Sequence, residues 1–342
     1  MDKKILLIYT GGTIGMKKNP VSGVLEPFDF NQILEEVPEL RGFEFGIDTY
    51  SFNPLIDSSD ARPEFWIQIA EIIRDNYEEY CGFVVLHGTD TMAYSASALS
   101  FMLENLEKPV IFTGSQLPIG MLRTDGKENL IDSLELAAAR DPEGYPYVSE
   151  VCIYFETELF RGNRTTKFSA EAFRAFQSPN YPVLAKVGTH IRYDTTSLYR
   201  PRSWGNPLLL HTRLDTHVAV IKMFPGISED FVQSVLHSDG IRAVVLETYG
   251  SGNAPSCSWF IDALREFTGK GGIVVNVTQC QTGVVDMETY ANGKTLLDAG
   301  VVSGGDMTTE AAVTKLFVLL GQYSDNKTVR IKFKIGVSGE IS

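Results

Sequence analysis

Two threonines enclose a pair of glycines in the segment Thr10–Thr13, directly after the apolar run at 5–9. Glycines let a ligand come close to the backbone, and a threonine hydroxyl can act as a nucleophile once a base activates it. The same residues could also form a tight turn in which Thr13 caps a helix. Nucleotide binding is disfavoured, because neither the GxxxxGK[ST] nor the GxGxxG spacing is present. The segment therefore indicates either a reactive hydroxyl or a simple turn.

Two more polar segments precede segments with a helical pattern. Gly88, Thr89 and Asp90 follow the apolar run at 83–87, where free N–H groups at a helix start would favour an oxyanion. A carboxylate at such a strand end could also hold a substrate ammonium group. Asp57 and Ser58 lie in the sequence LIDSSD, just ahead of a second helix. Helix capping is the alternative explanation for both segments.

A basic loop contributes the candidate proton acceptor. Lys167 closes the sequence RGNRTTKF, and the charges of Arg161 and Arg164 would lower its pKa from the usual value of about 10.4. A neutral lysine can take a proton from a hydroxyl; a solvated basic loop is the alternative. The five histidines come with no GxSxG elbow and no obvious cysteine partner. A set of threonine, lysine and aspartate would provide a nucleophile and its base without histidine or metal.

The elements that must position these residues alternate along the chain. Short apolar runs at 83–87, 109–114 and 150–155 are separated by amphipathic segments such as EFWIQIAEIIRDNY and MAYSASALSFMLENL. This rhythm predicts an α/β fold, with a parallel sheet covered by helices. Ligands of such sheets bind outside the carboxyl ends of the strands, which is where the candidate loops lie.

The 342 residues are long for a single hydrophobic core and favour two domains. The alternation stops at 192–215, which is rich in Pro, Arg and single Gly residues, and it resumes afterwards. We expect an N-terminal domain at 1–191, an interdomain linker at 192–215 and a smaller C-terminal α/β domain at 216–342.

Composition narrows the class of partner. The formal net charge of −13 disfavours a nucleic-acid surface. The four cysteines are widely spaced and show no metal-ligand pattern, and no apolar stretch approaches the ~20 residues that span a bilayer. The first residues do not have the pattern of a secretory leader. We expect a cytoplasmic protein with reduced thiols and a small-molecule partner.

Six motifs occur along the chain in one order: YTGGTIGM, PLIDSSD, LHGTDTMAYSASALSFMLENL, RGNRTTK, YGSGNAP and VNVTQC. Together, in this order and spacing, they resemble the bacterial-type L-asparaginases, and their cytoplasmic type I branch in particular. The resemblance implies a larger N-terminal domain with a flavodoxin-like, mainly parallel sheet and a smaller C-terminal α/β domain. It also implies hydrolysis of L-asparagine to L-aspartate and ammonia through an acyl-enzyme, without a cofactor or metal.

Residue roles follow from the same resemblance. Thr13 matches the family's nucleophile, which attacks the amide carbon. Thr89 matches a second essential threonine, and Lys167 and Asp90 complete the proton-relay set.

Substrate contacts are implied in the same way. Asp90 looks like the ligand of the α-ammonium group, with Gly88 and Thr89 beside it, and Asp57 and Ser58 match the residues that hold the α-carboxylate. Ser115 matches a position whose backbone carbonyl receives the leaving amide nitrogen. Asn253 matches a residue that reaches a neighbouring subunit's active site, which implies a dimer or a dimer of dimers.

Two positions depart from the family pattern. Many members carry a lid tyrosine about ten residues beyond the nucleophile, but Val24 and Leu25 stand there. Activation of Thr13 must then come from another group, for example from Glu288 or from a tyrosine elsewhere in the chain. The composition of the lid segment at 15–27, with Gly, Pro and two lysines, suggests a mobile segment that closes over substrate.

The second departure concerns cooperativity. Cooperative type I members bind a second asparagine through a threonine, a cysteine and an arginine; Thr166 and Cys280 match the first two, whereas Glu247 replaces the arginine. An acidic side chain cannot pair with the carboxylate of an effector. We therefore expect little or no activation by substrate.

Other functions remain open from the sequence. A broader amidohydrolase with glutaminase activity is one, although the DSSD loop favours asparagine. Asparaginase-like amidotransferase subunits share the core motifs but carry an additional N-terminal domain, for which the first strand at residue 4 leaves no room. A sensor that binds asparagine without cleaving it is another class, disfavoured because Thr13, Thr89, Asp90 and Lys167 are all present.

Overall fold

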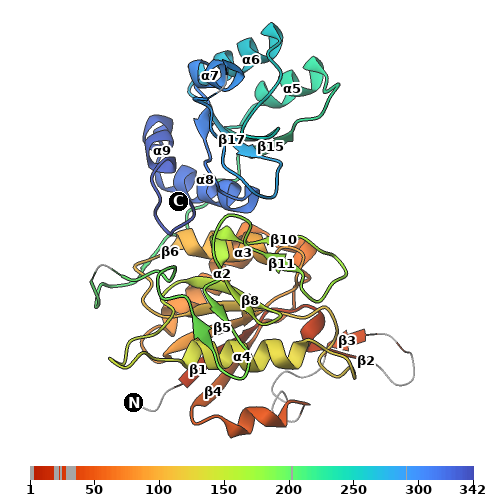
Figure 1. Ribbon diagram of the computed structural model, residues 1–342, viewed down its shortest axis with the longest axis vertical. Coiled ribbons are helices and arrows are strands. Elements are labelled where there is room, and N and C mark those ends of the chain that lie inside the picture. The colour runs from red at the N-terminus through yellow and green to blue at the C-terminus, as the bar shows by residue number, and fades with distance from the viewer. Residues whose placement is uncertain (1–3, 19–22, 24, 28–35, 202, 290) are drawn as a thin grey trace. The chain divides into compact units, whose positions relative to one another are not determined.

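The structure, a computed structural model, describes residues 4–18, 23, 25–27, 36–201, 203–289 and 291–342. The chain divides into two compact units, Met1–Leu210 and His211–Ser342. Each unit has its own sheet and its own core, so the two are described separately (Figure 1).

An eight-stranded sheet forms the centre of the first unit. Its strands in spatial order are β13 (Arg192–Tyr193), β12 (Ala185–Lys186), β9 (Glu158–Arg161), β8 (Val151–Phe155), β7 (Val110–Thr113), β5 (Gly82–Leu86), β1 (Lys4–Tyr9) and β4 (Gly46–Ser51). The five strands from β8 to β4 are parallel, and the three beyond β8 are antiparallel.

The parallel strands have the order of a flavodoxin-like sheet. Numbered along the chain, β1, β4, β5, β7 and β8 stand in the spatial order 2-1-3-4-5. In this order the crossover after β1 runs to one side and the crossover that leads to β5 runs to the other, so the strand order reverses between β1 and β5. Ligands of such sheets bind at this point. The predicted fold class is confirmed, and the loops after β1 and β5 are placed side by side.

Helices cover both faces of this sheet (Figure 1). The helices are α2 (Pro63–Asp75), α3 (Met92–Met102) and α4 (Gly126–Ala138). Leu130 and Leu134 of α4 pack in one core with Ile5 and Leu7 of β1. The alternate side chains of the strands point to the other face, where Phe65 of α2 contacts Phe52 and His87.

One of the crossover connections of this sheet has an unusual hand. The crossovers β5–α3–β7 and β7–α4–β8 both step to the same side, yet their helices lie on opposite faces. They therefore have opposite hands. Because such crossovers are almost always right-handed, and α2 and α3 share a face, the connection through α4 is the left-handed one.

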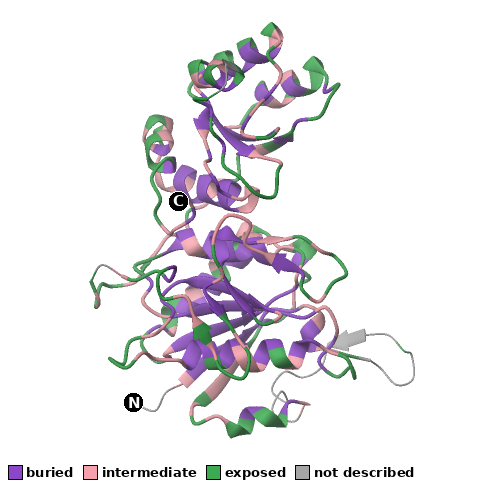
Figure 2. Cartoon of the chain, viewed as in Figure 1, coloured by how far each residue is buried: buried purple, intermediate pink, exposed green. Residues whose placement is uncertain are grey.

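The apolar runs that predict strands are buried on both faces, as parallel sheets require (Figure 2). All five residues of β5 and of β8 are buried. The helix expected at 92–106 stops at Met102, because Leu103–Glu104 (β6) pairs with Leu209–Leu210 (β14) and Asn105 turns with a φ of 62°. Tertiary pairing thus overrides the helical pattern there.

The segment at 192–215, expected to be a linker, belongs largely to the first unit. It begins in strand β13 and reaches β14, and the division between units falls after Leu210. A buried ion pair holds this segment at Ser197. Arg161 donates to Glu150 at 2.5 Å and to the Ser197 carbonyl at 2.9 Å. The turn residues described here therefore lie mostly in surface loops of the first unit.

The second unit holds a four-stranded parallel sheet in the order of the chain. Its strands are β15 (Val218–Lys222), β16 (Ala243–Thr248), β17 (Ile273–Thr278) and β18 (Val302–Ser303). Its helices are α5 (Glu229–Leu236), α6 (Ser258–Gly269), α7 (Ala291–Asp298), α8 (Thr309–Gln322) and α9 (Asn326–Phe333). Phe260 and Leu264 of α6 pack with Val244 and Leu246 of β16 to form the core.

Candidate functional site

The loop after β1 packs closely against two neighbouring loops. Gly11 and Gly12 have φ values of 134° and 92°, which favour glycine. A Cβ on Gly11 would lie 2.3 Å from the Ile56 carbonyl oxygen, and one on Gly12 would lie 2.7 Å from the backbone of Gly88. Any larger residue at either position would therefore push the loops apart.

Thr10 and Thr13 have different surroundings in this loop. Thr10 is buried and its hydroxyl donates to the Leu86 carbonyl at 2.9 Å, which joins β1 to β5. Thr13 begins the short 3-10 helix η1 (Thr13–Gly15), while Gly12 holds the N-cap position. The capping role considered for Thr13 is therefore wrong. Its half-buried hydroxyl makes no hydrogen bond to any residue that the structure describes.

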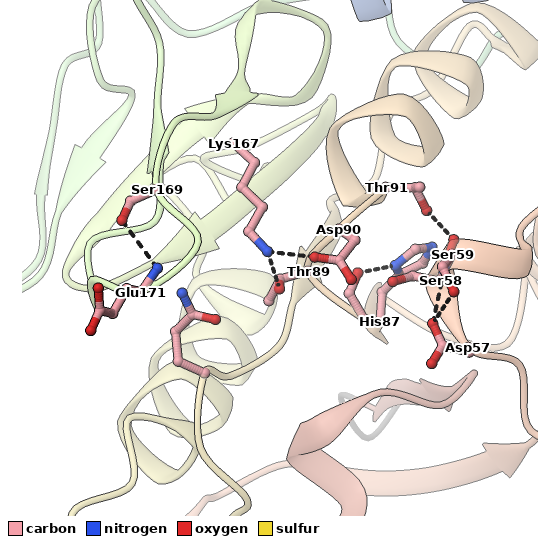
Figure 3. Close-up of polar contacts among 12 residues, drawn as sticks. Asp57, Ser58, Ser59, His87, Thr89, Asp90, Thr91, Lys167, Ser169 and Glu171 are labelled. Carbon is pink, nitrogen blue, oxygen red and sulfur yellow. Dashed lines mark hydrogen bonds and ion pairs between the residues drawn. The ribbon is translucent and has the colours of Figure 1, made fainter.

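Lys167 connects the loop after β5 to the strand β10 (Thr166–Lys167). Its Nζ lies 2.8 Å from Thr89 Oγ1 and 2.7 Å from Asp90 Oδ1 (Figure 3). The lysine side chain is 15% exposed and that of Asp90 66% exposed. Because the ammonium group donates to Thr89 Oγ1, the Thr89 proton is free to point at a ligand. The structure thus brings together three of the four residues predicted to be catalytic.

The two arginines of the basic loop have buried partners of their own. Arg161 binds Glu150, and Arg164, which is 1% exposed, donates to the Asn180 carbonyl at 2.9 Å. Both guanidinium groups also stack near the Tyr181 ring. Their charges are used to hold the fold.

The Asp57–Ser58 turn lies against the loop after β5. The Asp57 carboxylate accepts hydrogen bonds from the Ser59 N–H and hydroxyl, which lower its pKa, and so caps the 3-10 helix η4 (Ser58–Asp60). Ser58 is 4% exposed, and the Thr91 hydroxyl donates to its carbonyl at 2.7 Å (Figure 3). Thr91 is the N-cap residue of α3 but makes no cap hydrogen bond. Its hydroxyl instead holds the two loops together.

A buried histidine supports this loop, and its partners could not be predicted from the sequence. His87 Nδ1 lies 2.6 Å from the Gly88 carbonyl, and Nε2 lies 2.9 Å from Ser95 Oγ. The Trp66 indole donates to the same Ser95 oxygen at 2.9 Å. Since a carbonyl only accepts, Nδ1 carries the hydrogen and Nε2 accepts from Ser95. Burial lowers the pKa of His87 to about 4, so the ring is neutral at ordinary pH.

Ser115 follows β7, the next strand of the sheet. It is 3% exposed and its hydroxyl donates to the Leu117 carbonyl at 2.6 Å. β7 is parallel to β5, so this loop reaches the same edge as the loop of Thr89.

The remaining predicted residues fall into both units. Thr166 lies beside Lys167 in β10, whereas Asn253, Cys280 and Glu247 belong to the second unit. Cys280 is exposed. Glu247 accepts from the Thr309 hydroxyl at 2.6 Å and lies 3.5 Å from Lys222 Nζ, so its carboxylate is already occupied.

Three further observations concern the expected lid, groups that could hold a metal ion, and helices that could span a membrane. Leu25 lies in β3 (Leu25–Pro27), paired with β2 (Met16–Lys18), and Val24 lies outside the described residues. Among the residues described, no three His, Cys, Asp or Glu side chains are grouped so that they could hold a metal ion. In the same residues, every helix is too short or too polar to span a membrane.

Comparison with known proteins gives the family. The model of the asparaginase N-terminal domain matches residues 4–199, and that of the glutaminase/asparaginase C-terminal domain matches 217–333. The chain belongs to the asparaginase family. It is 46% identical to L-asparaginase 1 of Escherichia coli, over 99% of this chain and 98% of that one.

Solved structures of the asparaginase family agree in fold. L-asparaginase I of Vibrio cholerae has a TM-score of 0.90 at 42% identity, with both chains fully covered. The thermostable L-asparaginase of Thermococcus kodakarensis has a TM-score of 0.88 at 34% identity, with 99% of each chain covered.

Gly88→Ala should destabilise this asparaginase-family fold. Its Cβ would lie 2.5 Å from Ser58 Oγ and 2.8 Å from Ser58 Cβ, so the Asp57–Ser58 turn must move. We expect a loss of about 1–3 kcal/mol in the free energy of unfolding, measured in urea. Gly188→Ala is the matched control, because a Cβ there meets nothing within 4 Å. Equal stability of the two variants would contradict the contact.

His87 should make stability fall at acid pH. Its pKa is about 4 when folded and about 6.5 when unfolded, so the unfolded chain binds an extra proton between these values. Its full contribution is present above pH 6.5, and about 3 kcal/mol is lost as pH falls to 4. Urea unfolding of wild type and His87→Gln across this range measures the difference. Parallel pH profiles of the two proteins would show that His87 is not the titrating group.

Proposed function

We propose that this protein hydrolyses L-asparagine to L-aspartate and ammonia, as its relatives' names indicate for them. The observation that carries the proposal is the contact of Lys167 Nζ with both Thr89 Oγ1 and Asp90 Oδ1. It places a hydroxyl, a cation and a partly exposed carboxylate at the carboxyl edge of the sheet. This edge, at the point where strand order reverses, is the expected ligand site of the fold.

The proposed substrate site uses the charges of asparagine. Asp90 would bind the α-ammonium group, since much of its carboxylate is exposed beside Lys167. Ser58 would bind the α-carboxylate through its hydroxyl and N–H, with Asp57 shaping the turn. Because Gly88 has no side chain, this turn can lie close to the loop after β5. The Ser115 carbonyl would accept a hydrogen bond from the leaving nitrogen. Such a dense polar set suits a small substrate with two charged groups.

In the proposed reaction the Thr13 hydroxyl attacks the carboxamide carbon. The N–H of Thr89, which makes no hydrogen bond to the described residues, would stabilise the oxyanion. The proton from Thr13 passes to the amide nitrogen, the C–N bond breaks and ammonia leaves. Water then attacks the carbonyl carbon of the aspartyl ester, its proton passes through the Thr89 hydroxyl to the Thr13 oxygen, and the C–O bond breaks to release L-aspartate, while Lys167 Nζ holds the Thr89 oxygen in place. The group that activates Thr13 would replace the missing lid tyrosine; Glu288 is one candidate from the sequence.

Self-association is part of the proposal. Asn253 sits in a turn closed by hydrogen bonds between Tyr249 and Asn253 in both directions. Thr248 donates to the Asn276 side chain, which in turn donates to the Gly252 carbonyl at 2.9 Å, so this turn is preformed. The Asn253 amide would complete a neighbouring subunit's site in a dimer or tetramer. A cytoplasmic location is proposed with it, and no nucleic-acid or membrane partner.

Ammonia release from L-asparagine and L-glutamine tests the function. We expect the wild type to turn over asparagine faster than glutamine. We expect kcat to fall by about 10³-fold or more in Thr13→Ala and in Thr89→Val, because each removes a reacting hydroxyl. Calorimetric binding of L-aspartate serves as the control for an intact site. Binding of asparagine by a folded wild type without ammonia release would make the protein a sensor instead.

The substrate dependence of the rate should be hyperbolic. Glu247 occupies the position of the effector arginine and is already paired with Thr309 and Lys222, so an effector carboxylate would be repelled. Steady-state rates over a wide range of asparagine concentration give the curve. A sigmoidal curve that Thr166→Ala converts to a hyperbola would contradict this expectation.

A further inference from the structure

Asp125 occupies the N-cap position of α4 but does not cap the helix. Its side chain makes no cap hydrogen bond; the Thr124 hydroxyl accepts from the Gly126 N–H at 2.9 Å instead. Aspartate is among the best capping residues, so an acid that leaves this role is held by stronger partners elsewhere.

These partners are in the loop that follows β7. The Asp125 carboxylate accepts the Gln116 N–H at 3.1 Å and 2.9 Å and the Leu117 N–H at 3.1 Å. The Asn129 amide, one turn further along α4, lies 3.4 Å away and also donates to the Gly114 carbonyl at 3.0 Å. Asp125 and Asn129 are 8% and 2% exposed. The first turn of α4 thus holds the backbone on both sides of Ser115.

Binding of the Gln116 N–H also fixes the Ser115 carbonyl, because both belong to the same peptide group. The Ser115 carbonyl and the Gln116 N–H are the two ends of one planar trans peptide, and they point in opposite directions. A carboxylate fixed at the N–H end therefore fixes the direction of the carbonyl. Although Ser115 is 3% exposed, its carbonyl accepts no hydrogen bond from the described part of the chain. Buried carbonyls are nearly always paired, which favours a ligand as the partner of this one.

We propose that Asp125 is a positioning residue that aims and polarises the Ser115 carbonyl toward the leaving nitrogen. This inference rests on the proposed function. When the C–N bond breaks, the nitrogen gains the proton from Thr13 and develops positive charge. A negative charge at the N–H end of the peptide increases the negative charge on its carbonyl oxygen, because hydrogen-bonded dipoles polarise one another. The carbonyl then stabilises the leaving group more in the transition state than in the ground state.

The test compares an amide with an ester. The β-methyl ester of L-aspartate has the same α-groups and acyl carbon as L-asparagine, but its leaving oxygen carries no hydrogen to donate to Ser115. For Asp125→Asn and Asp125→Ser we expect kcat/KM to fall about 10- to 100-fold for the amide and less than about threefold for the ester. Since kcat/KM reports steps up to acylation, the shared deacylation step does not enter.

Thr124→Ala is the matched control. It removes the hydroxyl that caps α4 and donates to the Leu117 carbonyl at 3.0 Å, but it leaves the Gln116 N–H bound to Asp125. We expect its amide-to-ester ratio to equal that of the wild type, even where its stability falls. The ratio is taken on one preparation with both substrates, so the fraction of folded enzyme cancels.

The outcomes are distinct. A selective loss with the amide in both Asp125 variants supports the positioning role. An equal loss with both substrates, or no loss with the amide, overturns it and leaves Asp125 a structural residue. A wild type that cleaves neither substrate overturns the proposed function itself and this inference with it.

Discussion

The contact of backbone with backbone at the carboxyl edge of the sheet is the constraint on which the site depends. Gly12 lies against the Gly88 backbone, and Gly11 lies against the Ile56 carbonyl, at distances that leave no space for a single carbon atom. Three loops from different strands can therefore meet within one small volume. The polar groups that converge there, on Thr89, Asp90 and Lys167, have their positions because the main chains beneath them touch.

The sheet supplies the direction of these loops, and the helices fix their details. Thr91 and Asp125 occupy N-cap positions and neither caps its helix. Each turns its side chain to a neighbouring loop instead, and holds Ser58 or Gln116 there. The start of a helix that follows a parallel strand is suited to this, since it lies next to the ligand edge and its side chains are within reach of the adjacent loops. In α4 the neighbouring Thr124 hydroxyl makes the capping hydrogen bond instead, which leaves the Asp125 carboxylate available for the loop.

Much of this could be predicted from the sequence, and the limit is a physical one. The runs at 83–87 and 150–155 were recognisable as strands because both faces of a parallel sheet are apolar. The order of the strands and the left-handed crossover through α4 are not encoded in local periodicity. Contacts such as Thr91 to Ser58 depend on loops 33 residues apart and on differences of a fraction of an ångström. The contacts of His87 could not be predicted, because its partner Ser95 and the neighbouring Trp66 lie on two different helices. They become neighbours only in the folded chain.

The carboxylate of Glu247 has a consequence for how this protein could change. It is bound by Thr309 from the start of α8 and by Lys222 from the adjacent strand β15. An arginine introduced there alone would face the Lys222 ammonium group and would deprive the Thr309 hydroxyl of its acceptor. The effect of exchanging the acidic for a basic residue at this position is thus epistatic, because it depends on which residues stand at 222 and 309.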